Sequence, residues 1–411
     1  MWILLLLLWA DPAAFENTLR AGLEALRGNN LPIARARLED ASHMQPNSPQ
    51  VWMGLAQTYW KLNLPELARS AAAKAESAAP DSPVVLHGLA YFYSESGDPS
   101  RAAPMEARYA EKTPADHEAF ARAVDLYLQA RQAKPAITLA GRALAAEDRA
   151  DLHELLGQAY EMDGQPENAV LEMRAAIKLN AYEESYYFGL AQLYLRHQNA
   201  EAAVQILQDG RKVFAQSPQL ELALGVAYYG LRRFSDAADC FLRTIRMAPD
   251  VEQPYVFLGR MLDQAEDELP QVTAAYAARV KRKPDDYLAN FLYGKALSLA
   301  SGAPGDRRQI EALFRKSIAL KADFWESHYE LGILLERDRD FAGAAGEFQR
   351  AVELNPASPT PHYHLARVYE RLGKKEEAAA EHAAHERLSA EETSAIRSQE
   401  RALTPLDLGV K

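Results

Sequence analysis

Residues 218–249 read PQLELALGVAYYGLRRFSDAADCFLRTIRMAP, and this stretch decides the fold. A Leu224-Gly225 pair and Tyr228 come first, Ala237 and Phe241 follow, and a proline closes the stretch. The stretch matters because it is one copy of a pattern that recurs along most of the chain.

Two residue types recur with the same period, which is the main signal in the sequence. One series consists of tyrosines at intervals of 34, 34, 33, 34 and 34 residues: Tyr59, Tyr93, Tyr127, Tyr160, Tyr194 and Tyr228. The second series consists of alanines with the same spacing: Ala34, Ala68, Ala102, Ala136, Ala169, Ala203 and Ala237. A fixed period of this length is typical of repeat proteins that stack one supersecondary unit after another.

Each unit is predicted to form two helices. Apolar residues at i, i+3, i+4 and i+7 predict one face of a first helix: Trp52, Leu55, Ala56 and Tyr59. Pro65 suits the first turn of a second helix, which ends before Pro80. Small residues line the inner face of that helix and allow close packing: Ala68, Ala72 and Ala75.

The unit resembles the tetratricopeptide repeat, whose pattern is W-x2-L-G-x2-Y, then A-x3-F, then P. A second good copy is Leu331-Gly332, Ala344, Phe348 and Pro356. About eleven units cover roughly residues 15–390. The resemblance implies an all-α fold, a right-handed superhelical solenoid of tandem helix-turn-helix repeats.

The predicted organisation has three parts. Residues 1–10 are interpreted as a signal peptide, and residues 11–388 as the repeat array. Residues 389–411 are interpreted as a polar capping helix that covers the last apolar layer, followed by a tail. Irregular spacing and an insertion at residues 301–306 predict breaks in the repeat register near residues 263–310.

The chain begins MWILLLLLWA, an apolar run too short to span a bilayer. We interpret it as a secretory signal cleaved after Ala10, which predicts a bacterial-type protein exported to the periplasm or envelope. The alternative is a misassigned start, which leaves the protein in the cytoplasm. No other stretch is apolar enough to cross a membrane, so the mature chain is predicted to lack a transmembrane span.

The charge balance argues against nucleic acid as a partner. The chain has 46 basic and 57 acidic residues, a net charge of −11, which repels phosphate backbones. One basic cluster, Arg279 with residues 281–283, is interpreted as a solvated helix end. Cys240 is the only cysteine, which excludes an internal disulfide, and it is predicted to be a buried, inert thiol.

The resemblance implies that the first helices line a concave groove that holds a partner peptide. Excluding the packing positions of each first helix leaves the predicted groove residues: Gln57, Trp60, His87, Tyr91, Asp125, Glu154, Gln158, Phe188, Gln192, Leu195 and Tyr229. Aromatic side chains mixed with amides and carboxylates suit peptide recognition. The alternative is that these are ordinary solvated or partly packed positions.

We find no sequence motif for catalysis, and neither enzyme activity nor a cofactor is predicted. Three histidines of the last unit, His362, His382 and His385, fall on inward helix faces and are the candidates for a zinc-type site. The simpler interpretation, which we favour, is that a half-exposed terminal layer tolerates polar side chains.

The sequence therefore predicts a noncatalytic scaffold that binds a protein or peptide. The alternative is a noncatalytic subunit of a polysaccharide synthesis or export machine that contacts glycan. For the packing, it also predicts a close approach of Gly157 to Ala169.

Overall fold

A computed structural model describes residues 12–300 and 306–402. Every regular element within these ranges is helical, with 22 α-helices and one short 3-10 helix, and the predicted all-α solenoid class is confirmed. No helix among the described residues is long and apolar enough to span a membrane. The predicted signal peptide, residues 1–10, lies outside the described ranges.

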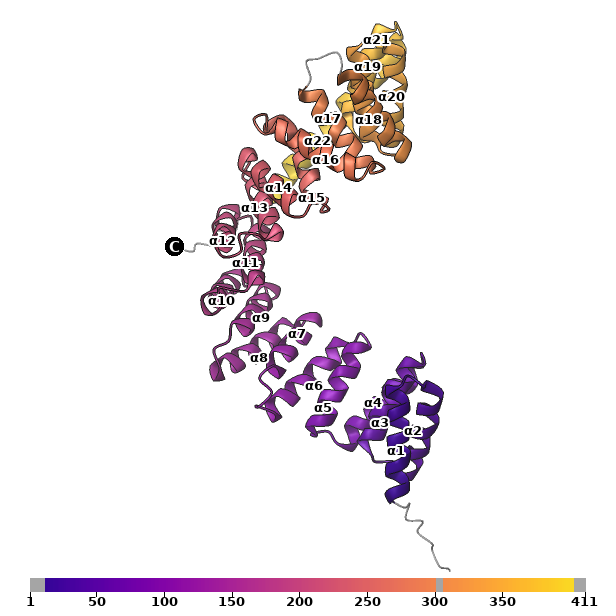
Figure 1. Cartoon of the computed structure of the whole chain (residues 1–411), viewed down its shortest axis with the longest axis vertical. Helices are drawn as coiled ribbons and strands as arrows, with labels where there is room; N and C mark the ends of the chain where they lie inside the picture. Colours follow the sequence, from indigo (N-terminus) through magenta and orange to yellow (C-terminus); the bar gives the residue numbers. More distant parts are fainter. Residues whose placement is uncertain (1–11, 301–305, 403–411) are drawn as a thin grey trace, which may run out of the picture. The chain divides into compact units, whose positions relative to one another are not determined.

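The chain divides into two compact units, Met1–Tyr186 and Tyr187–Lys411, which we call the N-terminal and C-terminal units. The N-terminal unit contains five helix hairpins (Figure 1). Their helices are α1 (Pro12–Arg27), α2 (Leu31–Met44), α3 (Pro49–Lys61), α4 (Pro65–Ala78), α5 (Pro83–Glu95), α6 (Pro99–Lys112), α7 (Ala119–Gln129), α8 (Ala133–Ala146), α9 (Ala150–Met162) and α10 (Pro166–Leu179).

The C-terminal unit contains six hairpins, and α11 starts just before the boundary between the units. The elements are α11 (Glu184–Arg196), α12 (Ala200–Val213), α13 (Pro218–Gly230), α14 (Phe234–Met247), α15 (Gln253–Arg260), η1 (Leu262–Gln264), α16 (Leu269–Arg282), α17 (Tyr287–Ala300), α18 (Asp306–Leu320), α19 (Trp325–Arg337), α20 (Phe341–Leu354), α21 (Pro359–Arg371) and α22 (Lys375–Ala402). Odd-numbered α-helices are the first helices of their hairpins, and even-numbered ones are the second helices.

The turn inside each regular hairpin depends on one residue in the left-handed conformation. After α3, Asn63 has a φ of 58°, and the N–H of Leu64 donates to the carbonyl of Tyr59 at 2.9 Å. This closes the helix with a Schellman motif. The same turn position is left-handed at Asn29, Gly97, Arg131, Gly164, Gln198, Arg232, Arg339 and Gly373.

Small side chains bring the two helices of a hairpin together, as the sequence predicts. In the second hairpin Ala68, Ala72 and Ala75 are fully buried. In the fifth, a Cβ atom added at Gly157 would lie 3.1 Å from the carbonyl oxygen of Ala169 and 2.8 Å from Cγ of Met173. The predicted close approach of Gly157 to Ala169 is confirmed.

In several hairpins, a side chain near the start of the first helix makes a hydrogen bond to the loop that precedes that helix. Trp52 donates from Nε1 to the carbonyl of Pro46 at 2.6 Å, and Asn290 donates to the carbonyl of Pro284 at 3.0 Å. The remaining cases, each reaching the carbonyl six residues back, are Tyr255 to Pro249, His328 to Ala322 and His362 to Pro356. In these five hairpins, different residue types therefore perform one structural role, which is to join the first helix to the loop that precedes it.

Two regions depart from the regular repeat. The first helix of the eighth hairpin, α15, has 8 residues and is followed by η1, in the part of the chain where the sequence predicts a change of register. Most of the predicted insertion, residues 301–305, lies outside the described ranges. At the other end, the predicted boundary at Ser389 falls inside α22, a continuous helix of 28 residues, so the cap extends the last second helix.

The basic cluster at the end of α16 requires a correction. Arg279 is only 2% exposed, and its Nη2 lies 2.9 Å from Oδ2 of Asp286, while its guanidinium covers the ring of Tyr255. The interpretation as a solvated helix end is wrong for Arg279, because it occupies a packing position of the repeat, where Ala75 and Ala176 are fully buried in other hairpins. Arg282 and Lys283, which lie near Asp250, are exposed as predicted.

Candidate functional site

The predicted groove residues of the N-terminal unit all lie on first helices. They are Gln57 and Trp60 on α3, His87 and Tyr91 on α5, Asp125 on α7, and Glu154 and Gln158 on α9. None of these side chains is fully buried, and Tyr91 is 58% exposed. Trp60 is half-buried and meets Phe92 edge-on, so it also contributes to packing.

Three of these residues line one cavity of about 230 Å³ between α5 and α7. His87, Tyr91 and Asp125 are joined there by residues that the groove prediction did not include: Ala90, Ser94, Glu106, Arg122, Leu126 and Gln129. The structure therefore brings together predicted residues from neighbouring hairpins.

Glu106, on the second helix α6, forms the buried base of this cavity. Its side chain is 3% exposed, and its two oxygens accept from Nδ1 of His87 at 2.9 Å and from Nε of Arg122 at 2.8 Å. Arg122 also donates to Asp116 at 2.6 Å, which lowers the pKa of the Asp116 carboxyl. Sequence reasoning missed Glu106, although an acid at a repeat position filled by Ala72 and Ala140 was a usable signal.

The carboxyl groups of Asp125 and Glu154 have no basic partner among the described contacts. Asp125 accepts from the amide of Gln129 at 2.8 Å. Glu154 is half-buried, and burial together with Glu183 and Asp151 raises the pKa of its carboxyl. Asp125 on α7 and Glu154 on α9 are therefore two carboxyl groups whose described side-chain contacts are the neutral amides of Gln129 and Gln158.

The C-terminal unit holds the other four predicted groove residues. Phe188, Gln192 and Leu195 lie on α11, with Gln192 exposed and the other two half-buried. Tyr229 on α13 is half-buried, and its ring meets Phe234 and Phe257 edge-on, with centroids 5.8 and 5.4 Å away. Tyr229 thus contributes to packing between hairpins as well as to the surface.

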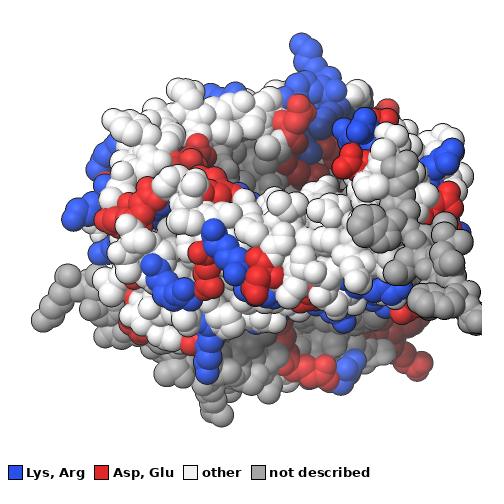
Figure 2. All heavy atoms as spheres, turned by 90° about the horizontal axis from the view of Figure 1, so that it is seen from below, with Lys and Arg blue, Asp and Glu red and all other residues white. Residues whose placement is uncertain are grey.

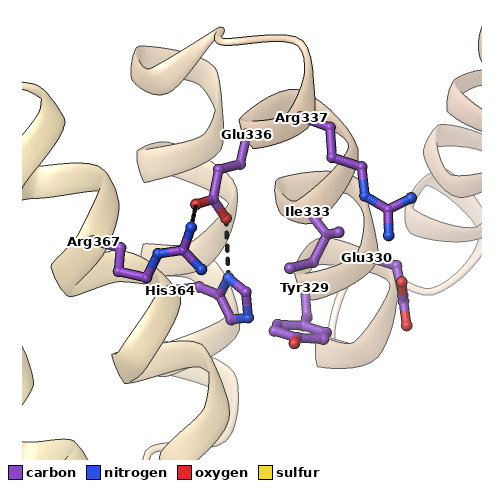
Figure 3. Close-up of a pocket in the computed structure, with 7 residues that line it drawn as sticks. All are labelled: Tyr329, Glu330, Ile333, Glu336, Arg337, His364 and Arg367. Carbon is purple, nitrogen blue, oxygen red and sulfur yellow. Dashed lines mark hydrogen bonds and ion pairs between the residues drawn. The ribbon is translucent and has the colours of Figure 1, made fainter.

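A larger cavity, of about 510 Å³, lies further along the C-terminal unit between α19 and α21 (Figure 3). Its lining residues are Tyr329, Glu330, Ile333, Glu336, Arg337, His364 and Arg367. Tyr329, Ile333 and Arg367 hold the same repeat positions as His87, Tyr91 and Asp125 in the other cavity. The groove prediction stopped at the seventh unit and missed them, although the repeat register was sufficient to find them.

Charged groups of both signs line this second cavity. Glu336 points between two partners, His364 Nδ1 at 3.0 Å and Arg367 Nη2 at 3.2 Å (Figure 3). Burial raises the pKa of the Glu330 carboxyl, and the charges of Lys295 and Arg337 oppose that shift.

The surface seen in Figure 2 also carries mixed charge. Lys and Arg lie there beside Asp and Glu, with uncharged areas between them.

The structure does not bring the three candidate histidines of the last hairpin together around a metal site. His362 contacts Glu381 through Nδ1 at 2.5 Å, His382 contacts Glu370, and His385 contacts the carbonyl of Pro359. Among the described residues, no group of three or more His, Cys, Asp or Glu side chains is placed to hold a metal ion. These histidines instead connect neighbouring helices and loops.

Cys240 is buried, as the sequence predicts. Burial and the nearby Glu221 carboxylate raise the pKa of its thiol to about 12. A thiol that stays protonated is a poor nucleophile, so the structure gives Cys240 a packing role.

Helix hairpins stacked one after another define an α-solenoid of the repeat class. A family model described as "Tetratricopeptide repeat" matches residues 19–83, 188–252, 307–359 and 329–391, together more than half of the chain. The chain belongs to the tetratricopeptide repeat family. Members of this class are typically protein-interaction scaffolds, and that general description fits the geometry above.

Several solved structures are similar to this chain, at low sequence identity. The yeast Tom70 structure is 14% identical, with 95% of this chain and 96% of that chain covered and a TM-score of 0.38. A structure of Naa15/Naa10 bound to HypK-THB is 16% identical, with a TM-score of 0.40 and 91% of this chain covered. This chain spans 63% of the length of that second protein. No curated protein sequence matches the chain.

Proposed function

We propose that this protein is a noncatalytic scaffold that holds a protein partner by a peptide segment lying along its first helices. The observation that carries the proposal is the pair of cavities at corresponding repeat positions, between α5 and α7 and between α19 and α21. Each is lined by an aromatic side chain together with acidic and basic groups. Such a combination provides a contact anchor and directional hydrogen bonds for a peptide.

We also propose that the protein is located in the cell envelope. This part of the proposal rests on the apolar segment at residues 1–10. Fractionation of cells that produce the full chain, and the chain lacking those residues, tests this part. Loss of the envelope pool on deletion supports export, whereas equal cytoplasmic pools contradict it.

A variant at the most exposed groove aromatic tests the binding function. Tyr91→Ala removes a 58% exposed ring from the first cavity, and Tyr182→Ala removes an 83% exposed ring from the loop between α10 and α11. Crosslinking and mass spectrometry in the source cells should identify a partner that contacts the wild type. We expect that contact to be lost in Tyr91→Ala and kept in Tyr182→Ala.

Either of two results would count against the proposal. Equal crosslinking in both variants means that the first helices do not form the binding surface. Binding of soluble envelope glycans that depends on Tyr91, with no peptide contact, would favour the alternative of a polysaccharide-handling subunit.

A further inference from the structure

Two carboxyl groups of the N-terminal unit, Asp125 on α7 and Glu154 on α9, have no ion-pair partner among the described contacts. Building on the proposed function, we propose that the segment held by this unit is basic, with a Lys or Arg of the partner inserted between Tyr91 and Asp125. A second basic residue of the same segment then lies against Glu154 on the next first helix.

The cavity between α5 and α7 already uses its own positive charge. Arg122 is the one Lys or Arg among the lining residues, and it is shared between Glu106 at 2.8 Å and Asp116 at 2.6 Å. The guanidinium of Arg122 is therefore already shared between two carboxylates, and neither of them is that of Asp125. Asp125, whose described contact is the neutral amide of Gln129, is left to bind an incoming cation.

The shape of the cavity fits one long basic side chain. Its volume of about 230 Å³ is below the range of roughly 300–1,000 Å³ that is usual for small-molecule pockets. Ala90 and Leu126 give it apolar walls, and the exposed ring of Tyr91 stands at its edge. Lys and Arg pack their methylene chains on such surfaces while the charged head reaches a carboxylate.

Other carboxylates lie near Glu154, so the side chains around it also include negative charge. Burial is the largest cause of its raised pKa, and the charges of Glu183 and Asp151 add to it. Burial, followed by the charges of the same three carboxylates, raises the pKa of the Tyr186 hydroxyl to about 12, and Arg149, which is paired with Asp151 at 2.6 Å, opposes that shift. Glu154 itself contacts only the neutral amide of Gln158 among the described residues, so its carboxylate is left to attract a cation and to repel an acidic segment.

A neutral apolar segment fits less well. It would cover Asp125 and Glu154 without supplying a counter-charge, and removing unpaired carboxylates from water is costly. Charge complementarity therefore selects a basic segment over a neutral or acidic one.

Selection from a phage-displayed library of random short peptides, at low salt, tests the inference with the full chain as bait. The wild type is compared with the double variant Asp125→Asn/Glu154→Gln. The control variant Asp40→Asn removes the same kind of charge from an exposed position on the second helix α2. Tyr91→Ala is selected in parallel as the variant with a disabled groove, and melting curves show whether each variant is folded.

We expect Lys and Arg to be enriched in peptides selected by the wild type and by Asp40→Asn, and the enrichment to disappear with the double variant. The Kd of a selected basic peptide should weaken at least tenfold in the double variant, and added salt should weaken wild-type binding. Peptides that need Tyr91 but lack basic enrichment would overturn this inference and leave the proposed function intact. Failure to select any peptide that depends on Tyr91 would overturn both.

Discussion

A methyl group added at Gly225 on α13 would lie 2.6 Å from Cε1 of Phe241 on α14. The same relation holds in the tenth hairpin, where a methyl group at Gly332 would lie 2.6 Å from Cε1 of Phe348. Where the second helix has alanine at this position, as at Ala72, the first helix has a larger residue than glycine, Ala56. The two facing positions therefore share one limited volume, and their sizes are matched hairpin by hairpin.

Gly225→Ala should destabilise the C-terminal unit despite the better helix propensity of alanine. Phe241 is fully buried, and overpacking a buried side chain costs about 1–3 kcal/mol. Replacing glycine in a helix recovers roughly 1 kcal/mol. We expect a net loss of roughly 1 kcal/mol in denaturant unfolding.

The matched control is Gly346→Ala, at an exposed position inside α20 where an added methyl group meets no atom within 4 Å. That change should stabilise the protein. Introducing Gly225→Ala into a Phe241→Leu background should remove most of its cost, because the smaller side chain vacates the shared volume. Equal costs in both backgrounds would show that the two residues are not coupled.

Removing the buried contact between His328 and Glu347 should lower the stability of the fold more than removing an exposed contact of the same kind. Nδ1 of His328 lies 2.7 Å from Oε2 of Glu347, and Nε2 lies 3.2 Å from the carbonyl of Ala322. Glu347→Ala leaves a buried ring nitrogen without a partner, which costs about 1–3 kcal/mol. Thermal melts of the variant should show the loss.

The exposed pair His117 and Glu147, at 3.3 Å, is the comparison. Both side chains are largely in water, so Glu147→Ala should cost less than about 1 kcal/mol. If the two variants melt at the same temperature, the contact between His328 and Glu347 does not stabilise the fold.

The fold was largely predictable from the sequence because the repeat averages information over many units. The tyrosine and alanine series located the helix pairs, and the predicted contact of Gly157 with Ala169 is confirmed. Errors arose where one unit departs from the average. Arg279 occupies a position where most repeats have a small residue, and its buried guanidinium is paired with Asp286, which lies in the loop just before α17.

The candidate site was less predictable for a related reason. Groove positions follow from the repeat register, so Tyr91 and Asp125 could be proposed in advance. Glu106 lies on the second helix α6 and lines the cavity beside the small Ala90 of α5. Such a residue is found when side chains from three helices are placed together, which periodicity alone does not do.

Arg232→Gly should stabilise the C-terminal unit. Arg232 ends the turn between α13 and α14 with a φ of 59°, a conformation that costs a residue with a Cβ atom roughly 1–2 kcal/mol. Glycine adopts it without that cost but loses more entropy on folding. We expect a net gain of about 0.5–1 kcal/mol by denaturant unfolding.

The reverse change provides the control. Gly164→Ala, at the corresponding turn of the N-terminal unit with a φ of 74°, should lower stability by a similar amount. A stabilising effect of alanine there would mean that the turn relaxes to another conformation, and the explanation for Arg232 would fail with it.

Glu154→Gln should raise stability at neutral pH and have little effect in acid. Burial and the charges of Glu183 and Asp151 raise the pKa of this carboxyl in the folded protein above its value in the unfolded chain. Below the unfolded pKa the group is protonated in both states and carries no penalty. As the pH rises through the unfolded and then the folded pKa, ionisation increasingly favours the unfolded chain, so the penalty is complete above the folded pKa.

Glutamine has no such penalty, and the expected gain at pH 7 is on the order of 0.5 kcal/mol, shrinking toward zero near pH 4. Melting curves at both pH values measure it, with the exposed Glu24→Gln on α1 as the control. A gain that is the same at both pH values would mean that packing, and not charge, sets the effect. A gain confined to neutral pH would mean that the fold maintains an unfavourable carboxylate at the groove, as expected of a group retained to meet a cation on a partner.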